Sequence, residues 1–188
     1  IGDKPFINNS TYFNRKQKTV KLINKFISEG MNPKNIFTSG QSWGGWNSLR
    51  IAAFNSELIN SSIAFSPGCC DPKKNQKPGS NVAEEYKYFT YNLKSAKKIN
   101  ALVFSSNADS FENPESLSFL KNIKGIKMIG LPGFEAEKKI IKINGKVCKW
   151  DTHDQNNKNL TDGHYIISSS CFEPYIQVIK EYIESRMN

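Results

Sequence analysis

The feature that most constrains the fold is a glycine-rich turn that follows a β-prone run and precedes a helical one. Residues 35–39 are β-prone, residues 40–44 read Gly-Gln-Ser-Trp-Gly, and residues 46–54 have a helical pattern. This order fits G-x-S-x-G, in which a strand turns sharply into a helix and presents a serine hydroxyl, here Ser42. The glycines on either side suit a strained backbone that leaves no room for bulky neighbours. We therefore predict a strand, a tight turn and a helix here.

Strand and helix patterns alternate along the rest of the chain. Apolar residues recur at three-to-four-residue spacing in residues 12–30, where Gly30 supplies a C-terminal stop. Beyond the glycine-rich turn we expect strands at residues 62–66, 101–105 and 126–129, and helices at residues 83–96, 114–123 and 172–187. Such alternation predicts an α/β fold, with a mostly parallel sheet and helices on both faces.

Two segments depart from this alternation. Residues 138–150 carry isoleucines and a valine around Asn144-Gly145, the commonest two-residue hairpin turn, and predict a small hairpin insertion. Residues 69–81 are polar and rich in lysine, proline and glycine, which predicts a surface loop that could act as a lid. With 188 residues in all, we expect residues 1–188 to form a single domain.

The charge of the chain suggests a class of partner that its distribution then argues against. A formal net charge of +9 invites nucleic-acid binding, but the basic residues are nearly all lysines spread along the chain. Only Arg15, Arg50 and Arg186 can make the bidentate forks typical of phosphate recognition. We expect a solvated lysine-rich surface and no nucleic-acid partner. Membrane insertion is not expected either, because no apolar run approaches the roughly 20 residues that cross a bilayer.

The four cysteines are too few and too irregularly spaced to predict a disulfide scaffold or a zinc site. Cys69 and Cys70 are adjacent and would bridge only with strain, whereas Cys148 and Cys171 can pair in an oxidising compartment. The compartment itself stays open.

A serine that attacks a carbonyl needs a base, and the chain has two histidines. His164 follows the last expected strand and precedes the C-terminal helix, where a side chain can reach the carboxyl edge of the sheet. His153 lies in a polar run beside the expected hairpin, where a solvated role is typical. We therefore favour His164.

The base in turn needs an acid to orient it. Asp109 is the first choice, because it lies in the loop that follows the expected strand at residues 101–105. Glu112 is the second choice and Asp71 the third. A turn or helix-capping role is the alternative for Asp109. Ser42, Asp109 and His164 stand in the order serine, acid, histidine that the G-x-S-x-G pattern has in α/β hydrolases.

On these residues the chain resembles the α/β-hydrolase superfamily, nearest to dienelactone-hydrolase-like esterases. The resemblance covers the chain from about Tyr12 onward and implies a triad of Ser42, Asp109 and His164, with the Trp43 backbone N–H as an oxyanion donor. Dienelactone hydrolases usually carry cysteine as nucleophile, so Ser42 moves the expectation toward a serine esterase. Relatives also place several strands and a second oxyanion donor before the helix at residues 12–30, so we expect this chain to be N-terminally incomplete.

The resemblance implies a hydrolase that cleaves an ester of a small or medium molecule and needs no metal or organic cofactor. A peptidase, a thioesterase, a lipase and a catalytically inactive binding domain are the alternatives on the same fold. The candidate substrate-binding residues lie close in sequence to the proposed triad and are Gln41, Trp46, Phe111 and Tyr165, although aromatic residues there often pack in a core instead. By analogy, a periplasmic or secreted location is slightly favoured. Oligomeric state is not predicted.

Overall fold

A parallel sheet of four strands forms the centre of the structure. The computed structural model describes residues 11–69, 82–109, 111–112, 114–131, 142–143, 146–148 and 163–187. The strands are β1 (Phe37–Gln41), β2 (Ser61–Phe65), β3 (Ala101–Ser106) and β4 (Ile126–Leu131), and they lie side by side in chain order. Each adjacent pair is parallel. The carboxyl ends of all four strands therefore lie at one edge of the sheet.

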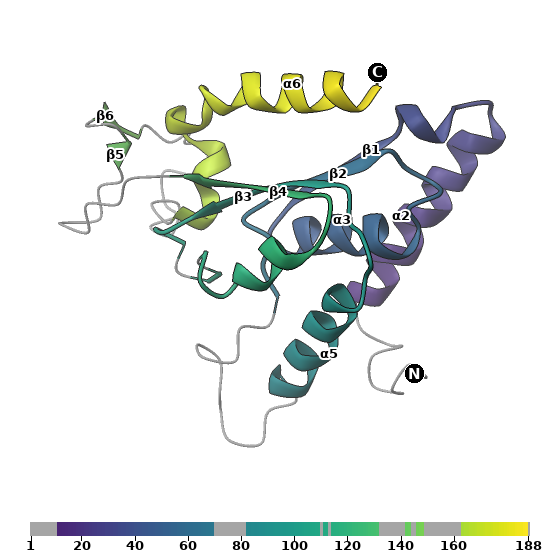
Figure 1. Cartoon of the computed structure of the whole chain (residues 1–188), viewed down its shortest axis with the longest axis horizontal. Coiled ribbons are helices and arrows are strands. Elements are labelled where there is room, and N and C mark those ends of the chain that lie inside the picture. Colours follow the sequence, from purple (N-terminus) through teal and green to yellow (C-terminus); the bar gives the residue numbers. More distant parts are fainter. Residues whose placement is uncertain are drawn as a thin grey trace.

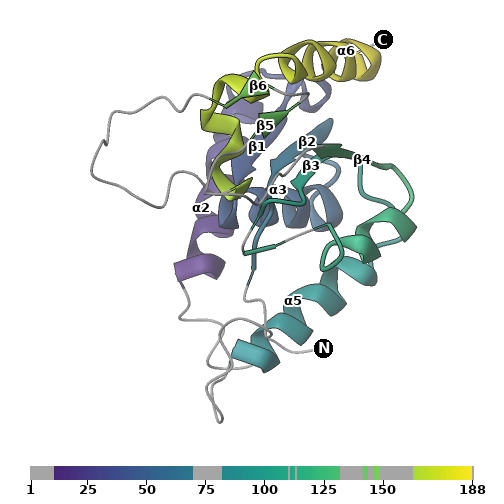
Figure 2. The same ribbon diagram turned by 90° about the vertical axis from the view of Figure 1, so that its left-hand side faces the viewer.

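Helices cover both faces of this sheet, as predicted. On one face lie α2 (Thr11–Ser28), α3 (Trp43–Phe54) and α5 (Val82–Lys94), and on the other lies α6 (Tyr175–Met187) (Figure 1). The view turned by 90° shows the same separation of α6 from α3 and α5 (Figure 2). The α/β class and the mostly parallel sheet are thus confirmed.

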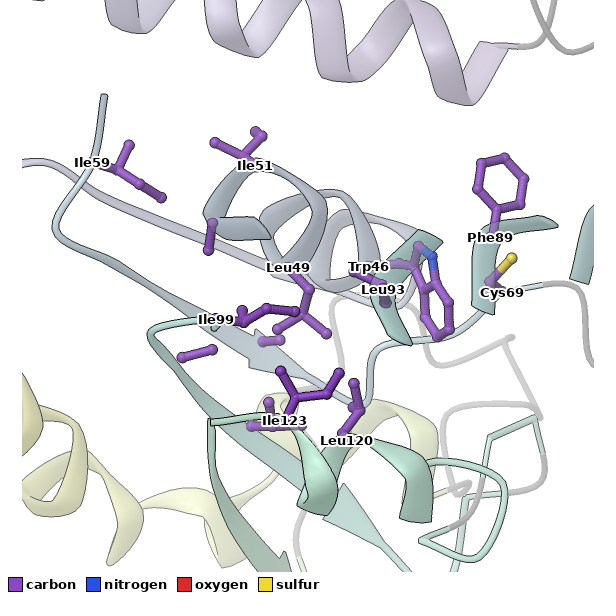
Figure 3. Close-up of a cluster of buried hydrophobic side chains, with 14 of the residues drawn as sticks. Trp46, Leu49, Ile51, Ile59, Cys69, Phe89, Leu93, Ile99, Leu120 and Ile123 are labelled. Atoms are coloured by element: carbon purple, nitrogen blue, oxygen red, sulfur yellow. The ribbon is translucent and has the colours of Figure 1, made fainter. Parts of the chain in front are cut away.

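The two faces of the sheet carry two separate apolar clusters. Along β3, Ala101 and Val103 point into the cluster beneath α2, α3 and α5, whereas Leu102 and Phe104 point into the cluster beneath α6. All six residues of β3 are buried. Burial on both faces is typical of a parallel strand inside a layered α/β fold and explains why this strand is almost continuously apolar. Figure 3 shows part of the first cluster, in which Trp46 lies among buried aliphatic side chains.

The glycine-rich turn joins β1 to α3, but β1 begins two residues later than predicted. Residues 33–35 form a short 3-10 helix, η1 (Pro33–Asn35), instead of the start of a strand. The Asn32 side chain accepts a hydrogen bond from the Lys34 N–H at 2.9 Å, and proline occupies the first turn. A capped turn that contains proline is therefore favoured over extended backbone here.

Several other elements also differ in extent from their predictions. The helix expected at residues 114–123 is a 3-10 helix, η2 (Ser118–Asn122). The C-terminal helix α6 begins at Tyr175, directly after a proline, which explains its late start. The hairpin predicted at residues 138–150 is present as an antiparallel pair, β5 (Lys142–Ile143) with β6 (Lys146–Val147), and its Asn144-Gly145 turn lies outside the described residues. Most of the loop predicted at residues 69–81 also lies outside them.

Asn60 ties the amino edge of the sheet to the end of α6. Its Nδ2 donates to the Lys34 carbonyl and to the Arg186 carbonyl, each at 2.7 Å. The Arg186 Nε donates back to Asn60 Oδ1 at 3.1 Å. One side chain thus links the segment before β1, the residue before β2 and the last turn of α6. We call this set of contacts the Asn60 clasp.

The cysteines are paired in the described structure. Cys148, which follows β6, forms a disulfide with Cys171 in the 3-10 helix η5 (Ser170–Phe172), which confirms that this pair can bridge. Cys69 is disulfide-bonded as well, and Cys70, the residue next to it, lies outside the described residues. No helix in the described ranges is both long and apolar enough to cross a bilayer.

Candidate active site

Ser42 occupies a strained turn at the carboxyl end of β1. Its backbone has φ 54° and ψ −125°, a conformation that serine rarely adopts. Backbone hydrogen bonds hold this conformation, among them one from the Ser42 N–H to the Phe65 carbonyl at 3.0 Å and one from the Trp46 N–H to the Ser42 carbonyl at 3.0 Å. The first bond joins the turn to β2 and the second begins helix α3. The surrounding fold therefore stabilises the strain.

Two of the three glycines around Ser42 are required by packing. A Cβ atom on Gly40 would lie 2.4 Å from the Gly44 carbonyl carbon, and one on Gly45 would lie 2.9 Å from the Gly40 carbonyl oxygen. Neither contact is sterically possible without movement of the backbone. A Cβ on Gly44 would meet nothing within 4 Å, so the expectation that both glycines flanking the serine relieve crowding is wrong for Gly44. Gly45 has that role instead.

A buried histidine and a buried aspartate contact each other beside this turn. His164 Nδ1 lies 2.9 Å from Asp109 Oδ2 and 3.1 Å from Asp109 Oδ1. The two side chains are 4% and 0% exposed. Asp109 Oδ1 also accepts the N–H groups of Phe111 and Glu112, at 2.8 and 2.9 Å. These two bonds turn the chain after β3 and fix the orientation of the carboxylate toward the histidine.

The segment that carries His164 is held against the same turn. His164 lies in the 3-10 helix η4 (Gly163–Ser168), and the Gly163 N–H donates to the Ala108 carbonyl at 3.1 Å. A Cβ atom on Gly163 would lie 2.5 Å from Ala108, so only glycine permits this approach. On the other side, Gln41 Nε2 donates to the His164 carbonyl at 2.6 Å. Gln41 thus supports the backbone of His164.

Gly68 marks the point at which these groups meet. It follows β2, and its N–H donates to the Ser42 carbonyl at 3.1 Å. A Cβ atom on Gly68 would lie 3.5 Å from Ser42 Oγ, 3.3 Å from His164 Cε1 and 3.4 Å from Glu112 Cγ. The serine hydroxyl and the imidazole are therefore both next to one small space at the carboxyl edge of the sheet. Gly68 was not among the residues predicted for the site, because it is far from Ser42 in the sequence.

The two carboxylates weighed as partners of the histidine have different surroundings. Asp109 contacts His164, whereas Glu112 Oε1 accepts the Cys69 N–H at 3.2 Å and Glu112 Oε2 accepts the Ser116 hydroxyl at 2.6 Å. Glu112 is 2% exposed. The second histidine of the chain, His153, and the third candidate acid, Asp71, lie outside the described residues.

The aromatic residues predicted to bind substrate separate into two groups. Phe111 is 49% exposed, with its ring centroid 4.7 Å from that of His164, and the Tyr165 ring lies 5.2 Å from His164. Both flank the histidine. The expectation for Trp46 is wrong: this side chain is fully buried in the core and packs near Phe119 (Figure 3). Its position on the inner face of α3 directs it into the apolar cluster between the helices and the sheet.

The side chain of Trp43, the residue after the serine, contacts helix α5. Its ring packs edge-to-face on Phe89 of α5, with centroids 5.4 Å apart. Its backbone N–H is the first of helix α3 and so belongs to the positive end of the helix dipole. Within the described residues, no three His, Cys, Asp or Glu side chains gather closely enough to hold a metal ion.

The structure is similar to solved structures of α/β hydrolases. Arabidopsis thaliana SOBER1 and its F65L variant match at TM-scores of 0.51 and 0.52, with 16% and 17% identity over 95% and 96% of this chain. A structure from work on LipS and LipT, two metagenome-derived lipolytic enzymes, matches at a TM-score of 0.60, with 13% identity over 94% of this chain and 74% of that chain. No protein-family model and no curated protein matches the sequence.

These matches establish the α/β-hydrolase fold. The chain spans about two thirds of the SOBER1 chains, 65% of one and 67% of the F65L variant. The nearness to dienelactone-hydrolase-like esterases stays a prediction.

Proposed function

We propose that this protein is a serine hydrolase that cleaves an ester bond of a small or medium molecule. The observation that carries the proposal is that Ser42 Oγ and the imidazole of His164 border the same space next to Gly68, and that this buried histidine contacts a buried aspartate. A serine hydroxyl is a weak nucleophile by itself and needs such a base. The lipolytic activity of the matched enzymes agrees with this proposal.

In the proposed reaction, His164 accepts the proton of the Ser42 hydroxyl as its oxygen attacks the ester carbonyl. Asp109 holds the imidazole so that Nδ1 carries the proton and Nε2 is free to accept one, and it stabilises the imidazolium that forms. The imidazolium then protonates the leaving alcohol. A water molecule, activated in the same way, releases the acid from Ser42 and regenerates the enzyme.

The negative charge on the carbonyl oxygen needs hydrogen-bond donors that are already in place. We assign one donor to the Trp43 N–H, because it is at the first position of α3 and the N-terminus of a helix favours negative charge. Each such donor contributes about 3 kcal/mol to the stability of the transition state. A second donor is not assigned.

The surroundings of the histidine indicate where the alcohol part of the ester binds. The leaving oxygen must lie near the imidazole that protonates it. Phe111 and Tyr165 flank that ring, and Phe111 is half exposed. We therefore propose that an apolar or aromatic alcohol group contacts these two side chains.

Covalent labelling tests the proposal directly. The protein is treated with a fluorophosphonate and its intact mass is measured, together with the variants Ser42→Ala and His164→Ala. Ser39→Ala and His153→Ala are the matched controls, because Ser39 is an exposed serine on the same strand and His153 is the only other histidine. One adduct on the parent and on both controls, with none on the two site variants, is the expected result.

An inactive binding domain would give a different result. It predicts no adduct on any of these proteins, with folding unchanged by circular dichroism. An adduct that persists in Ser42→Ala would place the nucleophile elsewhere and refute the assignment. A labelled protein is next assayed on p-nitrophenyl esters, thioesters and peptides, which separates an esterase from a thioesterase or peptidase.

A further inference from the structure

The buried carboxylate of Glu112 has no part in the proposed reaction. Glu112 is 2% exposed and lies three residues after Asp109. Its own N–H donates to Asp109 Oδ1 at 2.9 Å, so the turn that orients Asp109 also fixes the backbone of Glu112. Burial of a carboxylate is costly unless hydrogen bonds compensate for lost water. The contacts that compensate therefore indicate what this residue does.

The two carboxylate oxygens join two segments that are distant in sequence. Oε1 accepts the Cys69 N–H at 3.2 Å, and Oε2 accepts the Ser116 hydroxyl at 2.6 Å. Cys69 belongs to the loop after β2, and Ser116 belongs to the segment after β3. Glu112 thus fixes the loop after β2 from the side of β3.

The described part of that loop, Gly68 and Cys69, lies beside the candidate site. Gly68, directly before Cys69, donates its N–H to the Ser42 carbonyl at 3.1 Å. The position of a Cβ on Gly68 would be within 3.5 Å of atoms of Ser42, His164 and Glu112. The loop is therefore held at two successive amides, Gly68 by the backbone of Ser42 and Cys69 by the side chain of Glu112. A shift of the second contact would move the loop relative to the serine and the imidazole.

We propose that Glu112 is a positioning residue of the site, which holds the Gly68–Cys69 backbone against Ser42 and His164 through its hydrogen bonds. This inference depends on the proposed serine hydrolase function. It assigns Glu112 a role separate from that of Asp109, whose carboxylate contacts the histidine. The role requires a side chain that forms hydrogen bonds with both the Cys69 N–H and the Ser116 hydroxyl, and a neutral side chain that forms both should also fulfil it.

Two substitutions of Glu112 distinguish the effect of its hydrogen bonds from the effect of its charge. In Glu112→Gln, the amide oxygen can accept the Cys69 N–H and the amide nitrogen can donate to the Ser116 oxygen, so the geometry is kept without the charge. In Glu112→Ala both contacts are lost. Glu115→Gln is the matched control, because Glu115 is exposed and three residues away. Reductant is left out of all assays, because Cys69 is disulfide-bonded.

The measurements are kcat and KM for p-nitrophenyl butyrate, the rate of fluorophosphonate labelling, and hydrogen exchange of the peptide that contains Cys69. For Glu112→Ala we expect kcat and the labelling rate to fall about 10- to 100-fold, because small misplacements near the reacting atoms have effects of this size. We expect KM to change less than threefold and the Cys69 peptide to exchange faster. Glu112→Gln should stay within about threefold of the parent, like Glu115→Gln.

Other outcomes overturn the inference in distinguishable ways. If the parent labels at Ser42 and Glu112→Ala labels equally fast, the positioning role fails while the proposed function stands. If Glu112→Gln is as impaired as Glu112→Ala although both are folded by circular dichroism, charge is what matters and the role fails. If the parent itself neither becomes labelled nor hydrolyses the ester, the proposed function is wrong, and the positioning role that depends on it is wrong as well.

Discussion

Replacement of Asp109 by asparagine tests the proposed triad, because it should change which nitrogen of His164 carries the proton. Asp109 Oδ1 accepts two backbone N–H groups, from Phe111 and Glu112. An asparagine must keep its carbonyl oxygen toward these donors, because its NH₂ group cannot accept them. The NH₂ group then faces His164 Nδ1, in the place of the Oδ2 atom that lies 2.9 Å away in the parent. His164 is forced to accept at Nδ1 and to carry its proton at Nε2, which leaves no acceptor for the serine proton.

The magnitude follows from this reversal of the tautomer. The same exchange in a triad of the serine protease type lowers kcat about 10⁴-fold, or about 5 kcal/mol in activation free energy. The stability cost is smaller, about 1–2 kcal/mol, because the two backbone hydrogen bonds survive as neutral ones. Asp109→Ala would be a poorer probe, since it leaves both N–H groups unsatisfied at about 1–3 kcal/mol each. The asparagine variant should therefore be folded and nearly inactive.

The assay is the initial rate of p-nitrophenyl butyrate hydrolysis, with urea unfolding measured on the same samples. Glu115→Gln, an exposed carboxylate nearby, should match the parent in both measurements. An Asp109→Asn variant that keeps kcat within about tenfold of the parent would refute the proposed role of Asp109. A loss of activity matched by a loss of folded protein would instead contradict the small stability cost worked out above, because reversal of the tautomer lowers kcat without unfolding the chain.

Other predictions follow from single contacts. Gly68→Ala should lower kcat at least tenfold with the fold intact by circular dichroism, because its methyl group would enter the space between the serine and the imidazole; an unchanged kcat would contradict this placement. Asn60→Ala should lower the free energy of unfolding in urea by about 2 kcal/mol through loss of the clasp, with labelling at the active site unaffected. Cys148→Ser with Cys171→Ser should lower it by about 3 kcal/mol, since the bridge closes a loop with a sequence separation of 23; equal stability of parent and variant would argue against this bridge. Burial raises the pKa of Tyr182 above its ordinary 10.0, so its phenol ionises more readily in the unfolded chain than in the folded one. The free energy of unfolding should therefore fall as the pH rises past 10, and it should fall less steeply in Tyr182→Phe.

The order of the elements was predictable because it depends on local patterns. Alternating apolar runs and turns identified all four strands and the helices on both faces, and the glycine-rich turn after residues 35–39 identified the strand-to-helix junction. The exact start of β1 was not predictable from propensity, because the Asn32 cap and Pro33 compete with extended backbone. The 3-10 form of η2 and the late start of α6 are similar end effects, which depend on a few turn residues.

The site residues were predictable only in part, because their direction depends on tertiary packing. Trp46 stands four residues after Ser42, yet the helix turns it into the core. Asp109 and Glu112 share one turn, and their tertiary contacts distinguish them: Asp109 contacts His164, whereas Glu112 accepts the Cys69 N–H. Gly68 meets Ser42 and His164 through the register of β2 with β1, which no local pattern encodes. The only available signal was a Pro67-Gly68 pair shortly after a buried strand.

The two edges of the sheet have separate tasks in this chain. The Asn60 clasp joins three segments at the amino edge, whereas Ser42, Gly68 and Asp109 lie just after the carboxyl ends of β1, β2 and β3. Substitutions at well-separated positions usually add without interacting. Directed evolution can therefore vary two sets of residues in parallel. Variants around the Asn60 clasp can be selected for thermal stability, and variants around Phe111 and Tyr165 can be selected for a changed ester preference. Stability lost through substitutions near Phe111 and Tyr165 can be offset by stability gained around the clasp.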